Sequence, residues 1–211
     1  MSFVQLSAQE VVEDRTFTDL RHTKLDSQAI RFMVACVFLA LEEASTQLDS
    51  KLPILLHQPS AEGWTQRIVI TQPARLQSHA PLTVVGFFGI RNRGGDLSLA
   101  QKLDRQLIPE LSAYEALLAY ATVALPSGNF GNLVLFTSTE GKNEWGKSEK
   151  HAEAVRLLTP DYYAAVRLYN GVLAEGIANP DALQLLVIKY YDYGDCPIWR
   201  AVRHLDNGAG I

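Results

Sequence analysis

Cysteine is scarce in this chain, which has only Cys36 and Cys196 among its 211 residues. The two lie far apart in sequence, and Cys36 belongs to an apolar, helix-like run in which a buried, reduced thiol is expected. A chain of this length can bury enough apolar surface to fold without disulfide bonds. We therefore expect a reducing, cytoplasmic location.

Long apolar runs are also missing. The most hydrophobic segment, Phe32 to Leu41, is bounded by Arg31 and by Glu42 and Glu43. It has about half of the ~20 residues that a membrane-spanning helix needs, so it predicts a buried core helix. The opening segment MSFVQLSAQEVVEDR lacks the basic start and the apolar core of a signal peptide. We expect no membrane partner and no export.

Clusters of basic residues are absent too. The 19 Lys and Arg residues are scattered and are outnumbered by 23 Asp and Glu, which gives a formal net charge of −4. Nucleic-acid-binding proteins gather basic residues on one surface, so no nucleic acid partner is expected.

The sequence also lacks the common metal-binding and catalytic motifs. It contains no Cys-x-x-Cys pair, His-Glu-x-x-His motif, phosphate-binding Gly-rich loop, nucleophile elbow or dinucleotide fingerprint. We therefore predict no metal site.

Residues 1–80 predict one helix and two short strands. From apolar periodicity and turn residues, the predicted elements are, in order, a helix over 27–47 capped by Asp26 or Ser27, and strands over 53–57 and 66–71 separated by a loop at 58–63. The same α-β-β order recurs further along the chain. This region is therefore either an N-terminal α/β extension or a degenerate second repeat.

Residues 81–211 show a clearer pattern. The predicted elements are a strand over 82–91, a helix from the RNRGGD turn to about 111 capped by Asp96 or Ser98, strands over 114–125 and 133–138 joined by PSGNFGN, a helix over 143–158 ended by Pro160, a strand over 162–169, a turn at Asn170 and Gly171, and a strand over 183–193. The order β-α-β-β-α-β-β predicts a ferredoxin-like α+β domain, an antiparallel sheet with helices on one face.

The second part resembles the dimeric α+β barrel proteins, in particular those related to antibiotic-biosynthesis monooxygenases. The likeness rests on the hairpin ending in LVLFTS and on Trp145, Ser148 and His151 in EWGKSEKHAEA, and it covers mainly residues 81–193. It implies a homodimer whose sheets pack face to face, with a pocket between sheet and helices. The group includes cofactor-free oxygenases of aromatic polyketides, haem-handling proteins and proteins without known chemistry, so the fold does not select a reaction.

His151 is the candidate catalytic residue. At about 100° per residue, the predicted helix over 143–158 places it between Val155 and Leu158, in the same half turn as Trp145. An imidazole in apolar surroundings has a pKa that is easily moved across neutrality, which suits proton transfer or metal ligation. The alternative is a hydrogen-bonded core histidine without chemistry.

Candidate ligand-binding residues are Trp145, Ser148, Tyr120, Asn132 and Arg91. Trp145 either stacks on a flat ligand or is a packing anchor. Arg91 begins the RNRGGD turn, which is either a carboxylate or phosphate site before a helix N-terminus or a solvated turn.

A separate aromatic group, formed by Tyr190, Tyr191, Tyr193 and Trp199, predicts an interface with another subunit. Two functions of different class follow. One is a cofactor-free oxygenase or haem-handling enzyme acting on an aromatic or tetrapyrrole small molecule, with no cofactor or with haem. The other is a non-enzymatic dimerisation or binding protein.

Overall fold

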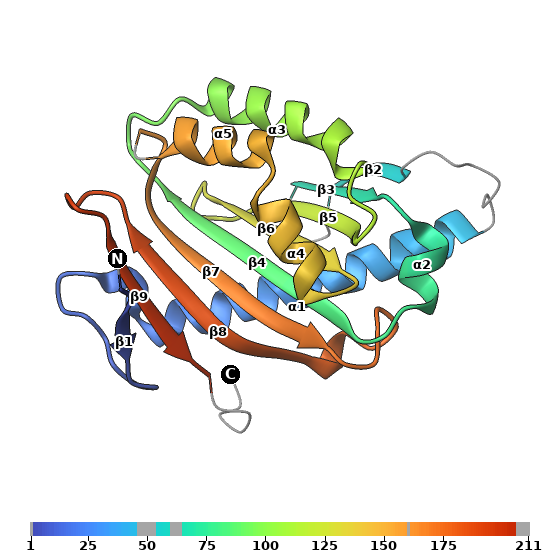
Figure 1. Ribbon diagram of the computed structural model, residues 1–211, viewed down its shortest axis with the longest axis horizontal. Coiled ribbons are helices and arrows are strands. Elements are labelled where there is room, and N and C mark those ends of the chain that lie inside the picture. The colour runs from blue at the N-terminus through green and yellow to red at the C-terminus, as the bar shows by residue number, and fades with distance from the viewer. Residues whose placement is uncertain (1, 46–53, 60–64, 160, 206–211) are drawn as a thin grey trace.

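The computed structural model describes residues 2–45, 54–59, 65–159 and 161–205 (Figure 1). The α-helices are α1 (Leu20–Ser45), α2 (Pro73–Ser78), α3 (Leu97–Leu111), α4 (Thr139–Gly146) and α5 (Glu149–Leu158). The strands are β1 (Val4–Leu6), β2 (Ile54–Pro59), β3 (Thr65–Ile70), β4 (Leu82–Arg91), β5 (Leu117–Ala124), β6 (Phe130–Phe136), β7 (Tyr163–Leu173), β8 (Leu183–Asp192) and β9 (Trp199–His204). The described residues do not include the end of the helix predicted over 27–47, the start of the strand predicted over 53–57, most of the loop 58–63, or Pro160.

The described strands form one mixed sheet in the order β1-β9-β8-β7-β4-β6-β5-β3-β2. All neighbouring pairs are antiparallel except β1 and β9, which run parallel. Four central strands lie side by side in the order β7-β4-β6-β5. Along the chain, β4 is the first of them, β5 the second, β6 the third and β7 the fourth. Helix α3 connects β4 to β5, and α4 and α5 connect β6 to β7. This is the ferredoxin-like arrangement, so the predicted α+β fold class is confirmed.

Further strands extend this core at both edges. The β2–β3 hairpin pairs with β5 through Gln66 to Ile70, and β8, β9 and β1 follow β7 on the other side. The helix and two strands predicted for residues 1–80 are therefore present, and their strands join the same sheet as the rest of the chain. β1 and β9 were not predicted.

Helices cover both faces of the sheet (Figure 1). The helices of residues 81–193, α3, α4 and α5, lie on one face, as predicted, whereas α1 crosses the opposite face and packs on β3, β4, β5 and β6. A Cβ on Gly86 of β4 would meet Ile30 of α1, while a Cβ on the oppositely oriented Gly89 would meet Tyr163. Strand β4 is apolar on both faces because each face meets its own hydrophobic layer.

α1 begins at Leu20, so the prediction that Asp26 or Ser27 caps it is wrong. Both residues lie within α1 rather than at its start, and their side chains are buried. The Asp26 carboxylate accepts hydrogen bonds from Arg167 Nε at 2.6 Å and Nη2 at 3.0 Å, and from the Tyr169 hydroxyl at 2.7 Å. These partners on β7 satisfy a charge that would otherwise be costly to bury. No helix in the described residues is long and apolar enough to cross a membrane.

The predicted helix over 143–158 is wrong, because two helices with a break between them occupy this region. α4 ends at Gly146, Lys147 is its C-cap, and Ser148 is the N-cap of α5. The Ser148 hydroxyl accepts the backbone N–H of His151 at 3.1 Å, the side-chain cap expected of serine. Trp145 and His151 therefore belong to different helices.

The predicted turn at Asn170 and Gly171 is also wrong, because β7 continues through both residues. The pairing of β7 with β8 shifts register between them, which indicates a bulge. A Cβ on Gly171 would collide with the Gln184 carbonyl oxygen, so the close approach of β8 requires glycine here. Asn170 is thereby held in a strand and faces the helices α4 and α5.

Candidate functional site

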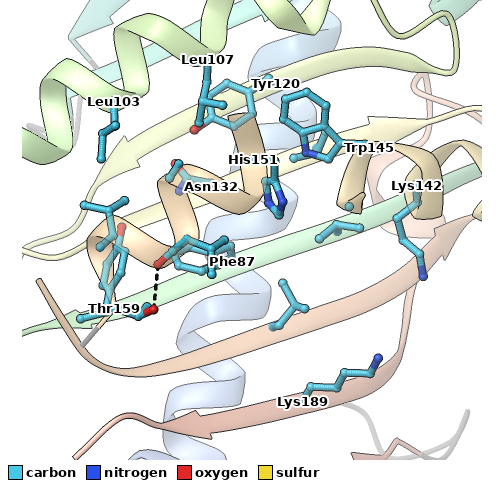
Figure 2. Close-up of a pocket in the computed structure, with 18 of the residues that line it drawn as sticks. Phe87, Leu103, Leu107, Tyr120, Asn132, Lys142, Trp145, His151, Thr159 and Lys189 are labelled. Atoms are coloured by element: carbon cyan, nitrogen blue, oxygen red, sulfur yellow. Dashed lines mark hydrogen bonds between the residues drawn. The ribbon is translucent and has the colours of Figure 1, made fainter. Parts of the chain in front are cut away.

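A cavity of about 590 Å³ lies between the sheet and the helices α3, α4 and α5. Its floor comes from β4 to β8, and its roof from the three helices (Figure 2). Apolar side chains form most of the wall, and they include Val85, Phe87, Leu103, Leu107, Val134 and Leu158. A volume of this size, lined by apolar groups with a few polar ones, is typical of a small-molecule site.

The floor is ordered by the strand register. Phe87 of β4 lies opposite Asn132 of β6 on one side and Leu168 of β7 on the other. Leu168 in turn lies opposite Lys189 of β8. One row across the sheet therefore reads Asn132, Phe87, Leu168, Lys189, with a polar residue at each end and two apolar residues between them.

His151 projects from the first turn of α5 toward this floor (Figure 2). Its ring donates a hydrogen bond to the Gly146 carbonyl, while burial lowers the pKa of the imidazole below its usual value. An imidazole that donates through one nitrogen carries a lone pair on the other when neutral. In the part of the chain that the structure describes, no side chain shares that second nitrogen. His151 is thus a neutral proton acceptor beside the cavity.

Trp145 lies beside His151 at the end of α4. Its ring is 7% exposed and packs edge-on against Tyr114 with 4.9 Å between ring centroids. The indole also contacts the His151 ring at 5.5 Å between centroids, and it lines the cavity. Trp145 is therefore a packing anchor that also presents aromatic surface to the cavity, so the two alternatives for this residue are compatible.

Two buried amide atoms at the cavity have no hydrogen-bond partner in the structure. They are Oδ1 of Asn132 on β6 and Nδ2 of Asn170 on β7. Asn170 uses its other amide atom, Oδ1, to accept a hydrogen bond from Lys142 Nζ at 3.1 Å. Buried polar atoms are normally paired, but both of these atoms are shielded from the open space of the cavity, so a ligand or water would reach them only after a shift of neighbouring side chains.

Of the residues predicted from the sequence, His151, Trp145, Tyr120 and Asn132 line the cavity. Ser148 does not, because its hydroxyl faces the α5 backbone as a cap. Arg91 also lies outside the lining, at the end of β4. The carboxylate of Asp96 occupies the α3 N-terminus by accepting the Ser98 and Leu99 N–H groups, so the RNRGGD segment fits the solvated-turn alternative better than the anion site.

The sequence analysis missed Lys142, Asn170 and Lys189. Lys142 fell just outside the predicted helix, and Asn170 was assigned to a turn. The predicted aromatic interface is also split, because Tyr190 is fully buried on the α1 side of the sheet while Tyr193 lines the cavity on the other side. Strand alternation along the predicted strand over 183–193 would have separated these two tyrosines, because they are three residues apart.

Metal-binding side chains do not gather at this site. Within the described residues, no group of three or more His, Cys, Asp or Glu side chains is placed to hold a metal ion. The side chains that line the cavity therefore supply one imidazole, three lysines, three amides, hydroxyl groups and aromatic rings.

Comparisons with known proteins give matches among solved structures only; no protein-family model and no curated protein matches the sequence. A candidate monooxygenase from Lactobacillus acidophilus is 7% identical with a TM-score of 0.35, and the match covers 52% of this chain and 51% of that one, about half its length. A monooxygenase-like protein from Listeria innocua is 12% identical with a TM-score of 0.32, covering 61% and 84%. An uncharacterized ferredoxin-fold protein from Listeria monocytogenes, related to antibiotic biosynthesis monooxygenases, is 11% identical with a TM-score of 0.32, covering 62% and 86%. The chain is thus similar, over half to three fifths of its length and at low identity, to ferredoxin-fold proteins described as monooxygenase-like.

Proposed function

We propose that the cavity binds a flat, mostly apolar small molecule and that His151 removes a proton from it, as in a cofactor-free oxygenase acting on an aromatic substrate. The observation that carries the proposal is the position of the His151 imidazole, whose pKa is lowered by burial, on the wall of a cavity of about 590 Å³. A planar ring system would be shielded from water by the apolar surface of Phe87, Trp145 and Leu168.

The surroundings of His151 suit a general base. A base must be unprotonated at working pH, and burial lowers the pKa of this imidazole in the required direction. When the free nitrogen takes a proton, the hydrogen bond from the other nitrogen to the Gly146 carbonyl stabilises the imidazolium that forms. The deprotonated substrate is then the species that reacts with dioxygen, so the chain itself need supply no redox group.

The test is oxygen uptake with anthrone, an aromatic compound with an acidic C–H bond, in metal-free buffer. We expect uptake faster than in buffer alone, and a loss of about 10²- to 10⁴-fold in kcat for His151→Ala, the range for removing a general base. Binding of anthrone should change little in this variant. Binding without any uptake in the unmodified protein would instead support the non-enzymatic alternative.

Haem handling is a second candidate, favoured by one feature of His151. An imidazole that is fixed by a hydrogen bond to a backbone carbonyl and presents its other nitrogen to a cavity is suited to bind iron. When bound, haem would supply redox chemistry that the side chains lack. A haemin titration tests this candidate: a shifted Soret band that is lost in His151→Ala supports it, and an unshifted band rules it out.

We further infer that the sheet is covered within one chain. The resemblance noted in the sequence implies sheets that pair face to face between two subunits. Here α1 covers that face with fully buried side chains such as Ile30, Met33 and Val37. A partner's sheet would have to displace this helix, so we propose a monomer whose cavity is complete without a second copy.

A further inference from the structure

The cavity has a positively charged end. Lys142 reaches it from α4 and Lys189 from β8, and Figure 2 shows both side chains at the end away from Asn132. Burial, and then the nearby charge of Lys189, lower the pKa of Lys142. Lys189 Nζ lies 5.7 Å from the Phe3 ring centroid, and neither lysine forms an ion pair with any acidic residue that the structure describes.

Asn170 holds one of the two lysines at this end, because its Oδ1 accepts a hydrogen bond from Lys142 Nζ. The other amide atom, Nδ2, is buried without a partner and is shielded from the cavity. On β7, Asn170 lies two residues beyond Leu168, which faces Lys189 across the strand pair. Two ammonium groups therefore lie at an end of the cavity where no anion is provided by the described chain. Such a set matches a carboxylate, which accepts several hydrogen bonds and carries the missing charge.

The other end of the cavity carries an uncharged amide, that of Asn132. Its Oδ1 is buried without a partner and is shielded from the cavity. Asn132 and Lys189 are three strand spacings apart in one row, which corresponds to about 14 Å at ~4.8 Å per spacing. Phe87 and Leu168 occupy the two positions between them. The floor thus runs from the two lysines across two apolar residues to the Asn132 amide.

We propose that the ligand is an aromatic acid, whose carboxylate binds Lys142 and Lys189 while its ring system lies on Phe87 and Leu168 beneath His151. This inference rests on the proposed function and specifies its ligand class. It assigns the two lysines to binding and orientation, and it leaves proton transfer to His151.

The test compares 2-naphthoate with 2-naphthalenemethanol, which has the same ring but no charge, by isothermal titration calorimetry. We expect the acid to bind at least about tenfold more tightly, because the alcohol leaves both ammonium groups without an anion. Lys142→Met and Lys189→Met should each remove most of this preference without weakening the alcohol, because Met keeps the apolar stem. The control is Lys150→Met, since Lys150 lies on α5 outside the cavity in an ion pair with Glu110.

The outcomes separate this inference from the function on which it rests. If neither compound binds, the proposed function fails and the ligand class falls with it. If both bind equally well, the cavity is a small-molecule site but the carboxylate assignment is wrong. A preference for the acid that survives both lysine substitutions would also overturn the assignment, because the charge would then be recognised elsewhere.

Discussion

Trp145 and His151 meet across the break between α4 and α5, with their ring centroids 5.5 Å apart and their planes tilted by 52°. This contact depends on the break, because a new helix begins after Ser148 and the imidazole lies in its first turn. The Gly146 carbonyl at the end of α4 then accepts the imidazole hydrogen bond. One helix interruption therefore positions the candidate base and fixes its orientation.

The lowered pKa of His151 predicts a pH dependence of stability. The unfolded chain binds a proton at a pKa of about 6.5, whereas the folded chain binds it only at lower pH, so protonation favours unfolding in this window. The contribution of His151 is therefore complete above about pH 7.5 and decreases as the pH falls below about 6.5. Urea unfolding above about pH 7.5 and well below about pH 6.5 should show a larger loss of stability on acidification for the unmodified protein than for His151→Gln.

His204→Gln is the control for that measurement, because His204 is exposed at the end of β9. His22, whose pKa is also lowered by burial, is present in all three proteins and cancels in the comparison. An identical pH dependence in the unmodified protein and in His151→Gln would show that the imidazole is not buried in neutral form.

The buried pair of Asp26 and Arg167 predicts a large stability effect. Asp26→Ala leaves the guanidinium of Arg167 buried without its carboxylate, and we expect a loss of about 3–5 kcal/mol in the free energy of unfolding. The double variant Asp26→Leu with Arg167→Met should recover most of this loss, because it removes both charges. Urea unfolding measures both values.

Asp19→Ala is the matched control for Asp26, since Asp19 pairs with Arg21 on the exposed surface near the start of α1. Asp19 also accepts the backbone N–H of Arg21 at 2.8 Å as the cap of α1. We therefore expect a loss of about 1 kcal/mol from the missing cap and hardly any from the exposed pair, well below the loss for Asp26→Ala. A small effect of Asp26→Ala would contradict the packing of α1 on β7 described above.

Coverage of the sheet by α1 predicts the mass of the protein in solution. Sedimentation equilibrium should give the mass of one chain, 23.4 kDa, at micromolar concentration. Twice that mass, reduced to one chain by a substitution such as Ile30→Asp on the inner side of α1, would show that a partner subunit rather than α1 covers this face.

Elements with local signals were predictable from the sequence. β4 spans the residues expected from its β-branched and aromatic run, and α3 is capped by Asp96, one of the two expected caps. In both cases the side chains that define the element are its own. The ferredoxin-like order followed from such local signals.

The errors occurred where distant contacts decide the structure. Asn170 and Gly171 are a typical turn pair, but Gly171 serves the close approach of β8 instead. β9 was missed because Arg203 interrupts its apolar pattern, yet Arg203 is fully buried and donates to the Thr18 carbonyl at 3.0 Å and to the Tyr190 hydroxyl at 2.7 Å. Alternation alone cannot show that a charged residue has such partners.

The candidate site was predictable in part, since the residues named from the sequence that line the cavity are His151, Trp145, Tyr120 and Asn132. The apolar surroundings of His151 were visible in the sequence, but the ring of polar groups around the cavity depends on strand register. Lys189, Asn170 and Asn132 come from three strands, and only the pairing of β8, β7, β4 and β6 places them on one floor. A one-residue change of register would have turned each of them to the α1 side.

The most direct test of the account is a crystal structure of the protein soaked with 6-bromo-2-naphthoate, with the bromine located by its anomalous signal. The account predicts one strong bromine peak inside the cavity toward Asn132, with the carboxylate beside Lys142 and Lys189. A bromine peak outside the space between the sheet and helices α3, α4 and α5, with that space filled by side chains, would contradict it.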